Sequence, residues 1–250
     1  MGGVLSRPAP QVPGQELREF HYTPGDFEHA RRLLYQQAGI SLSATKEQMV
    51  YSRLARRLRS LHLCSFADYF NYLAVHEEEW QQFINALTTN LTAFFRENHH
   101  FEMLAAHVRK HAHQHRPLRI WCSASSTGEE PYSLAMTVIE ALDSFTPAVE
   151  IIASDIDTGV LSVARNGIYP EERIELLEPA RKKRFFLRGK GGQSGKVRVR
   201  PELQALIEFR QINLLDSNWG IEPGLDVIFC RNVLMYFDKT TQNKILERLG

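Results

Sequence analysis

The sequence has few cysteines, almost no net charge and no long apolar segment. Its three cysteines, Cys64, Cys122 and Cys230, are scattered and lack the spacing of a metal site or a disulfide framework, which is typical of a reducing cytosol. With 30 basic and 29 acidic residues the formal net charge is +1, so nucleic acid is not the expected partner. There is no run of about 18 apolar residues, and the start lacks the apolar core of a secretory signal. We therefore predict a cytoplasmic protein without membrane insertion and without a metal site.

A segment near the middle of the chain has the pattern of a strand, a tight turn and a helix. An apolar run at residues 118–122 is followed by small residues around Gly128 and then by apolar residues at helical spacing up to Leu142. A dinucleotide site would need three spaced glycines, but here one glycine precedes Glu129 and Glu130, whose charges would repel phosphate. The two acids would accept a cation, and S-adenosylmethionine (SAM) carries a sulfonium and an ammonium group without phosphate. The alternative is that the acids only cap the helix.

Three further apolar runs end in polar side chains. The run that begins at Val149 ends at Asp155, and two later runs end at Asn213 and at Arg231 with Asn232. The carboxyl ends of parallel strands meet at one edge of a sheet, where an acid commonly accepts hydrogen bonds from ribose hydroxyls. This pattern predicts a crevice for a nucleotide-like ligand. The alternative is that these side chains only satisfy the backbone of the loops.

Composition and periodicity divide the chain into four parts. Residues 1–22 contain three prolines and little apolar periodicity, which predicts a flexible N-terminal arm. Residues 23–90 carry apolar side chains at helical spacing in four stretches and are predicted to form an all-helical domain. Residues 91–117 would form a linker and a connecting helix, and residues 118–250 the α/β domain.

The second predicted helix carries a basic ridge. Arg53, Arg56 and Arg57 are three and four positions apart, with Arg59 close by. Because guanidinium groups pair well with carboxylates, this ridge could dock an acidic helix. The alternative is a solvated face without a partner.

The strand and helix alternation stops at about residue 168 and resumes at about residue 205. Between these points are a charged helical segment, the run Phe185-Phe186-Leu187, a Gly-rich turn and the alternating Lys196-Val-Arg-Val-Arg200. Two short β runs around a Gly-rich loop predict an inserted hairpin. Such a hairpin could offer an edge strand to an extended peptide. The alternative is a plain long hairpin loop.

Seven blocks of the sequence form a specific combination, although no single block is specific. They are Asn90-Leu-Thr-Ala-Phe-Phe-Arg-Glu97, Ser125-Ser-Thr-Gly-Glu-Glu-Pro-Tyr-Ser133, Ala153-Ser-Asp-Ile-Asp157, Val197-Arg-Val-Arg200, Asn213-Leu214, Ile228-Phe-Cys-Arg-Asn-Val233 and Tyr236-Phe-Asp-Lys239. Together they resemble the chemotaxis receptor protein-glutamate O-methyltransferases, the CheR family. The resemblance extends from about residue 23 to the end of the chain.

The resemblance implies an α/β fold: a Rossmann-like SAM-dependent methyltransferase domain with an inserted small antiparallel β subdomain at about 168–205, preceded by an all-helical N-terminal domain. It implies that specific glutamate side chains on the cytoplasmic helices of chemoreceptors are methylated for sensory adaptation, with SAM as donor and S-adenosylhomocysteine as product. The basic ridge would meet those helices, and the β subdomain resembles the version that, in some members, captures a short peptide at the receptor's C-terminus. We expect a monomer.

The family also implies a set of site residues. The positions that line its cofactor site correspond here to Asn90, Thr92, Arg96, Glu129, Asp155, Asn213, Leu214, Arg231 and Asn232. Asp155 would suit the ribose hydroxyls, Asn213 and Leu214 the adenine end, and Arg96 and Glu129 the methionine end. Arg96 and Tyr236 are the candidates for holding the substrate carboxylate. A glutamate is already ionised at neutral pH and needs no general base, so catalysis would come from alignment and exclusion of water, worth up to roughly 7 to 11 kcal/mol in favourable cases.

Two other functions stay open. The SAM site could serve another protein or small-molecule substrate, because fold alone does not determine function. The chain could also be a non-catalytic receptor-binding module. The family pattern continues beyond Gly250 into further strands, and without them the strand at 225–230 would have an unpaired edge. Either the sequence is shorter than the natural chain, which we expect, or another copy covers this edge. The predicted activity therefore applies to the intact protein.

Overall fold

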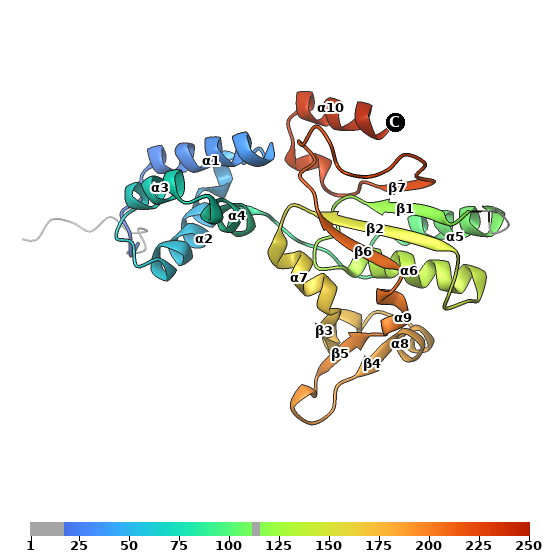
Figure 1. Cartoon of the computed structure of the whole chain (residues 1–250). Coiled ribbons are helices and arrows are strands. Elements are labelled where there is room, and N and C mark those ends of the chain that lie inside the picture. Colours follow the sequence, from blue (N-terminus) through green and yellow to red (C-terminus); the bar gives the residue numbers. More distant parts are fainter. Residues whose placement is uncertain (1–17, 112–115) are drawn as a thin grey trace, which may run out of the picture.

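The computed structural model describes residues 18–111 and 116–250, and the predicted N-terminal arm lies almost wholly outside them (Figure 1). The first described part is a helical domain, as predicted. Its helices are α1 (Pro24–Ala38), a 3₁₀ turn η1 (Ala44–Lys46), α2 (Glu47–Ser60), α3 (Phe66–Val75) and α4 (Glu77–Leu87). They enclose a core of their own, to which each α-helix contributes buried apolar residues at helical spacing.

Local sequence signals explain where α1 begins and ends. The Thr23 hydroxyl accepts a hydrogen bond from the Asp26 amide at 3.2 Å, and the Asp26 carboxylate accepts one from the Thr23 amide at 2.8 Å. This reciprocal pair satisfies two amides that have no partner within the helix. Gly39 ends the helix in the left-handed conformation at φ 67°.

A parallel sheet forms the centre of the second domain. Its strands are β1 (Leu118–Cys122), β2 (Val149–Asp155), β6 (Ile207–Gln211) and β7 (Val227–Phe229), in the order β6-β2-β1-β7. Every neighbouring pair is parallel, so all four carboxyl ends lie at one edge. The chain continues from β1 to β2 on one side and returns to β7 on the other, which places a topological switch point beside β1.

Helices cover both faces of this sheet (Figure 1). They are α5 (His99–His111), α6 (Glu129–Leu142), α7 (Thr158–Asn166) and α10 (Lys239–Leu249). Alternate strand residues serve opposite faces: Ile120 and Ile151 belong to the core that includes α5 and α6, whereas Trp121 and Ile152 pack with Ile245 of α10. The central strands β1 and β2 are largely apolar because both of their faces are buried, whereas β6 at the edge of the sheet alternates apolar residues with Glu208 and Arg210.

The inserted subdomain lies between α7 and β6 in the sequence and projects from the sheet domain (Figure 1). It contains β3 (Ile168–Pro170), η2 (Glu171–Ile174), α8 (Pro179–Phe185), β4 (Phe186–Arg188), η3 (Gly191–Gln193), β5 (Lys196–Val199) and α9 (Pro201–Gln204). The strands form an antiparallel sheet in the order β3-β5-β4, so the predicted hairpin is β4 and β5. The third strand was not predicted, because three residues directly after Gly167 are too few to show a period.

Within the part of the chain that the structure describes, no helix combines the length and the apolar character needed to cross a bilayer.

Candidate functional site

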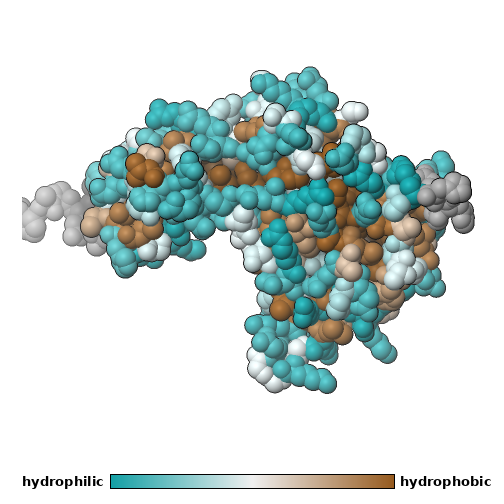
Figure 2. Space-filling view, viewed as in Figure 1, coloured by the Kyte–Doolittle hydropathy of each residue, from teal (hydrophilic) through white to brown (hydrophobic). Residues whose placement is uncertain are grey.

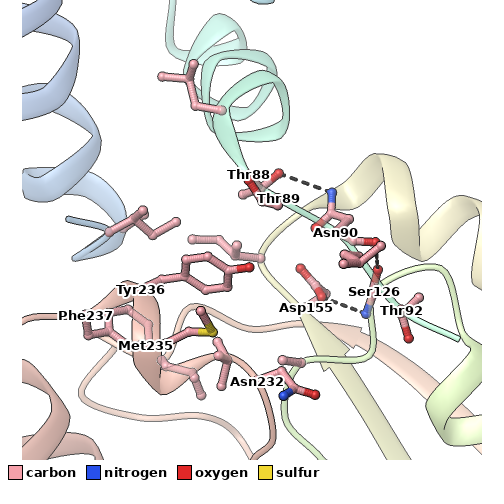
Figure 3. A pocket seen from close by; sticks show the side chains of 18 of the residues that line it. Thr88, Thr89, Asn90, Thr92, Ser126, Asp155, Asn232, Met235, Tyr236 and Phe237 are labelled. Atoms are coloured by element: carbon pink, nitrogen blue, oxygen red, sulfur yellow. Dashed lines mark hydrogen bonds between the residues drawn. The ribbon is translucent and has the colours of Figure 1, made fainter. Parts of the chain in front are cut away.

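A cavity of about 400 Å³ lies where the helical domain meets the carboxyl ends of the strands. Such a volume is in the range of small-molecule sites. Three parts of the chain form its wall: the segment 38–49 of the helical domain, the segment 87–96 that joins the two domains and is called the linker from here on, and the loops after β1, β2, β6 and β7. Figure 2 shows apolar surface as a brown band running from the helical domain towards the sheet domain. Figure 3 labels side chains of the linker and of the ends of β1, β2 and β7, which lie around one space.

Asp155, the last residue of β2, lies on the cavity wall. One oxygen of its carboxylate accepts a hydrogen bond from the Ser126 amide at 2.8 Å, and the other accepts one from the Asp157 amide at 3.0 Å. The side chain is mostly buried, and this burial raises the pKa of the Asp155 carboxyl from 3.8 to about 6. Each oxygen keeps a lone pair, so the carboxylate can accept hydrogen bonds from a bound diol.

A second acid, Asp157, holds the linker in place. Its carboxylate accepts hydrogen bonds from the Thr88 hydroxyl at 2.7 Å and the Asn90 amide at 2.8 Å, and it caps α7 through the Gly159 amide. These two hydrogen bonds therefore fix the start of the linker beside the cavity. Sequence reasoning did not assign a role to Asp157; the available signal was its place as the second acid of the block that contains Asp155.

The two acids after Gly128 point in different directions. Glu130 lines the cavity, whereas Glu129 is fully buried behind the wall and lies beside Arg173 of the inserted subdomain. Consecutive residues of an α-helix are about 100° apart around its axis, so only one of them can face the cavity. This corrects the sequence-based choice of Glu129 by one residue. The single glycine is needed for packing, because a Cβ at Gly128 would come within 2.8 Å of the Tyr169 hydroxyl.

Arg231 follows β7 and lies behind the wall. It pairs with Glu130 at 2.6 Å and with Glu97 at 3.3 Å, and it donates a hydrogen bond to the Arg96 carbonyl at 2.7 Å. Burial raises the pKa of Glu130, while the charge of Arg231 opposes that rise. Arg231 therefore contacts the linker and a cavity-lining acid without lining the cavity itself.

The other predicted cofactor residues line the cavity. Thr92 and Arg96 come from the linker, Asn213 and Leu214 follow β6, and Asn232 follows β7. The Asn213 side chain also donates to the Gln37 carbonyl of the helical domain at 2.8 Å. Asn232 and, after β1, Ser126 adopt left-handed backbone conformations at φ 54° and φ 48°. Such conformations in residues other than glycine are concentrated at functional sites.

Tyr236 also lines the cavity, in the 3₁₀ turn η4 (Leu234–Tyr236). In Figure 3 its ring points into the space beside Asp155 and Asn90. Its carbonyl accepts a hydrogen bond from the Ser41 amide at 2.7 Å, and Phe237 forms a β-bridge with Ile40. The helical domain thereby completes the wall with residues 38–49. Sequence reasoning missed this contribution, because nothing in the local pattern of that segment indicates a contact with residues almost 200 positions later.

The four arginines of the predicted basic ridge do not all face the same way. Arg57 forms a two-pronged pair with the buried Glu79, with distances of 2.9 and 2.6 Å, and Arg53 donates to the Ala86 and Thr88 carbonyls at the end of α4. These two arginines are four positions apart and face α4. Arg56 and Arg59 are exposed, and Arg59 lies 3.2 Å from Glu19.

Comparison with known proteins accounts for both domains. The family model described as the SAM binding domain of CheR methyltransferase matches residues 90–250, and the model for the all-alpha domain of CheR methyltransferase matches residues 25–88. This chain belongs to the CheR methyltransferase family. The cavity of this CheR protein lies where the two matched regions meet.

Several curated CheR relatives are similar along most of their length. "Chemotaxis protein methyltransferase 2" of Pseudomonas aeruginosa is 59% identical over 244 residues, which cover 98% of this chain and 86% of the relative. "Chemotaxis protein methyltransferase" of Escherichia coli is 50% identical over 224 residues, covering 89% of this chain and 77% of the relative. The Klebsiella aerogenes protein of the same name is 48% identical over 249 residues, covering 99% and 82%.

Proposed function

We propose that this CheR protein transfers the methyl group of SAM to the γ-carboxylate of specific glutamates on the cytoplasmic domain of chemotaxis receptors. The observation that supports this most strongly is the set of side chains that line the cavity. Asp155 and Glu130 supply carboxylates, Arg96 supplies a cation, and the turn after β1 has one glycine in place of a phosphate cradle. This set suits a cationic, phosphate-free nucleoside with a zwitterionic tail.

Each of these side chains would contact a different part of SAM. Asp155 would accept hydrogen bonds from the ribose hydroxyls, and Asn213 with Leu214 would contact the adenine. Glu130 would face the ammonium group and Arg96 the carboxylate of the methionine end, in place of the earlier assignment of Glu129. Asn90, Thr92 and Asn232 would complete the wall. Arg231 would act through Glu130 and the linker, because it lies behind the cavity surface.

The reaction requires alignment more than proton transfer. When bound, SAM supplies a methyl carbon made electrophilic by the sulfonium. A glutamate oxygen of the receptor would form the new bond to that carbon while the carbon–sulfur bond breaks and its electron pair stays on sulfur. No proton moves, because the glutamate is already ionised. Tyr236 and Arg96 would hold the incoming carboxylate, and the linker with the helical domain would exclude water.

Two exposed surfaces suit the receptor. Arg56 and Arg59 on α2 present cations that could pair with acids on a receptor helix, while Arg53 and Arg57 would support α2 from the other side. In the inserted subdomain β4 lies at one edge of its sheet and could pair with an extended tail peptide. A protein that acts on receptor cytoplasmic domains would work in the cytoplasm, and we propose that it does so as a monomer.

A labelling experiment tests the proposal. The protein is incubated with methyl-labelled SAM and a receptor cytoplasmic fragment, and we expect base-labile label on the receptor. A fragment with its candidate glutamates replaced by glutamine should take up none, and the variant Tyr236→Phe should transfer more slowly without a change in SAM affinity. Label only on other proteins would support a different substrate. Receptor binding without transfer would support a non-catalytic module.

The affinity for SAM should depend on pH through Asp155. Burial raises the pKa of this carboxyl to about 6, and the ionised form is the better acceptor for ribose hydroxyls. Below that pKa, binding must first remove a proton, so the affinity should fall as the pH falls, by about tenfold between pH 7.5 and pH 5. Calorimetric titration with S-adenosylhomocysteine at several pH values measures this. The variant Asp155→Asn should bind more weakly but without this pH dependence, and an equally steep profile in that variant would assign the titration to another group.

A further inference from the structure

The inserted subdomain contacts both the linker and the turn after β1, the two parts of the cavity wall nearest to it. Arg173, in η2 of the subdomain, donates a hydrogen bond to the Thr92 carbonyl at 3.2 Å, and its Nη1 lies 3.7 Å from Glu129 Oε1. Thr92 lines the cavity, and Glu129 is the first residue of α6. One guanidinium therefore bridges three separate segments.

The carboxylate that Arg173 faces is fully buried. One oxygen of Glu129 accepts a hydrogen bond from the Thr127 hydroxyl at 2.6 Å, whereas Oε1 has no hydrogen-bond partner among the described residues. A buried carboxylate is costly unless a cation compensates it. Among the residues that the structure describes, Arg173 is the cation within ion-pair distance of Oε1, and it stays half-exposed, so its own desolvation is limited.

Aromatic residues of the inserted subdomain also contact the linker and the turn after β1. The buried Phe94 ring of the linker makes edge-to-face contacts with Tyr169 at 5.3 Å and Phe186 at 5.4 Å between ring centroids. The Tyr169 hydroxyl donates to the Thr127 carbonyl at 2.7 Å. The apolar contacts explain why the linker lies on the subdomain. Arg173 adds a polar connection between Thr92 and Glu129, beside the direct hydrogen bond from the Phe95 amide to the Ser133 hydroxyl of α6 at 3.0 Å.

We propose that Arg173 is a positioning residue for the cofactor cavity. It holds the Thr92 segment of the linker at a fixed distance from the start of α6, so that Thr92, Arg96 and Glu130 meet a ligand in a prepared arrangement. The inserted subdomain would thus help to shape the cofactor site, in addition to any role in receptor capture. This inference rests on the proposed SAM site.

Binding and kinetics of three variants test the proposal. Arg173→Ala should weaken the binding of S-adenosylhomocysteine by about fivefold to tenfold, less than the loss of a direct charge-assisted hydrogen bond, because Arg173 is half-exposed and acts through the linker. The KM for SAM should rise by a similar factor and kcat at saturating SAM should stay close to that of the wild type, while the Tm should fall by a few degrees because the buried Glu129 loses its cation. Arg173→Lys keeps the charge near Glu129 and should recover part of the affinity. Lys182→Ala is the control, because Lys182 donates to Glu175 within the subdomain.

Each other outcome contradicts the proposal. Equal affinity in Arg173→Ala and Lys182→Ala would show that the bridge does not shape the site. A fall in Tm that accounts for the whole loss of binding, without recovery in Arg173→Lys, would show a purely structural role. A wild-type protein that binds no S-adenosylhomocysteine would overturn the proposed function together with this inference. Binding by the wild type with no effect of Arg173→Ala would overturn this inference alone.

Discussion

Replacing Asp155 with alanine should weaken SAM binding by about 100-fold. The carboxylate is the acid at the end of β2, it lies on the cavity wall, and its oxygens keep lone pairs for two ribose hydroxyls. Hydrogen bonds to a charged group contribute roughly 1.5 to 3 kcal/mol each, so losing two gives at least 3 kcal/mol, or a factor of more than 100 in Kd. Calorimetric titration of the folded variant with SAM or S-adenosylhomocysteine measures the change.

The control for Asp155→Ala must distinguish the loss of a negative charge from the loss of direct contacts with the ligand. Glu208→Gln on the neighbouring strand β6 removes the same unit of negative charge, but Glu208 is exposed and pairs with Arg210 away from the cavity. This variant should bind SAM as the wild type does. Asp155→Asn keeps the side-chain shape and one carbonyl acceptor, so it should fall between the two. An affinity of Asp155→Ala within threefold of the wild type would remove Asp155 from the ribose site.

Replacing Arg57 with alanine should destabilise the helical domain by about 3 kcal/mol, the low end of the usual cost of breaking a buried ion pair by removing one partner. Glu79 is buried and accepts two hydrogen bonds from Arg57 and one from the Tyr69 hydroxyl. Without Arg57 its charge is left without a cation. Urea unfolding followed by circular dichroism measures the effect.

Arg56→Ala on the same helix is the matched control, because Arg56 is exposed. It should leave the unfolding midpoint unchanged. Reversing the charge at Arg56 and Arg59 should instead slow receptor methylation while S-adenosylhomocysteine binding is retained. If Arg57→Ala unfolds at the wild-type midpoint and slows only receptor methylation, then Arg57 belongs to the docking surface, and the original prediction of a single ridge is restored.

The different orientations of the arginines on α2 could not be predicted from the sequence. A spacing of three and four positions places residues on neighbouring parts of a helix, but it does not say which part another helix covers. Arg53 and Arg57 face α4 because α2 packs there, whereas Arg56 and Arg59 face away. The same limit explains Glu129 and Glu130: the motif predicts an acid at the start of α6, and only the packing of α6 against the inserted subdomain decides which one reaches the cavity.

The sequence alone determined the features that depend on local periodicity and strand ends: four helices, a parallel sheet, an inserted β unit, and polar residues gathered at the carboxyl ends of strands. Apolar spacing and capping signals act over a few residues, so they can be read without the fold. The tertiary structure decided what depends on contacts between distant segments. These are the wall that residues 38–49 add to the cavity, the tie from Asp157 to Thr88 and Asn90, and the bridge from Arg173 to the linker. Such contacts depend on how the rigid elements pack together, which no local pattern records.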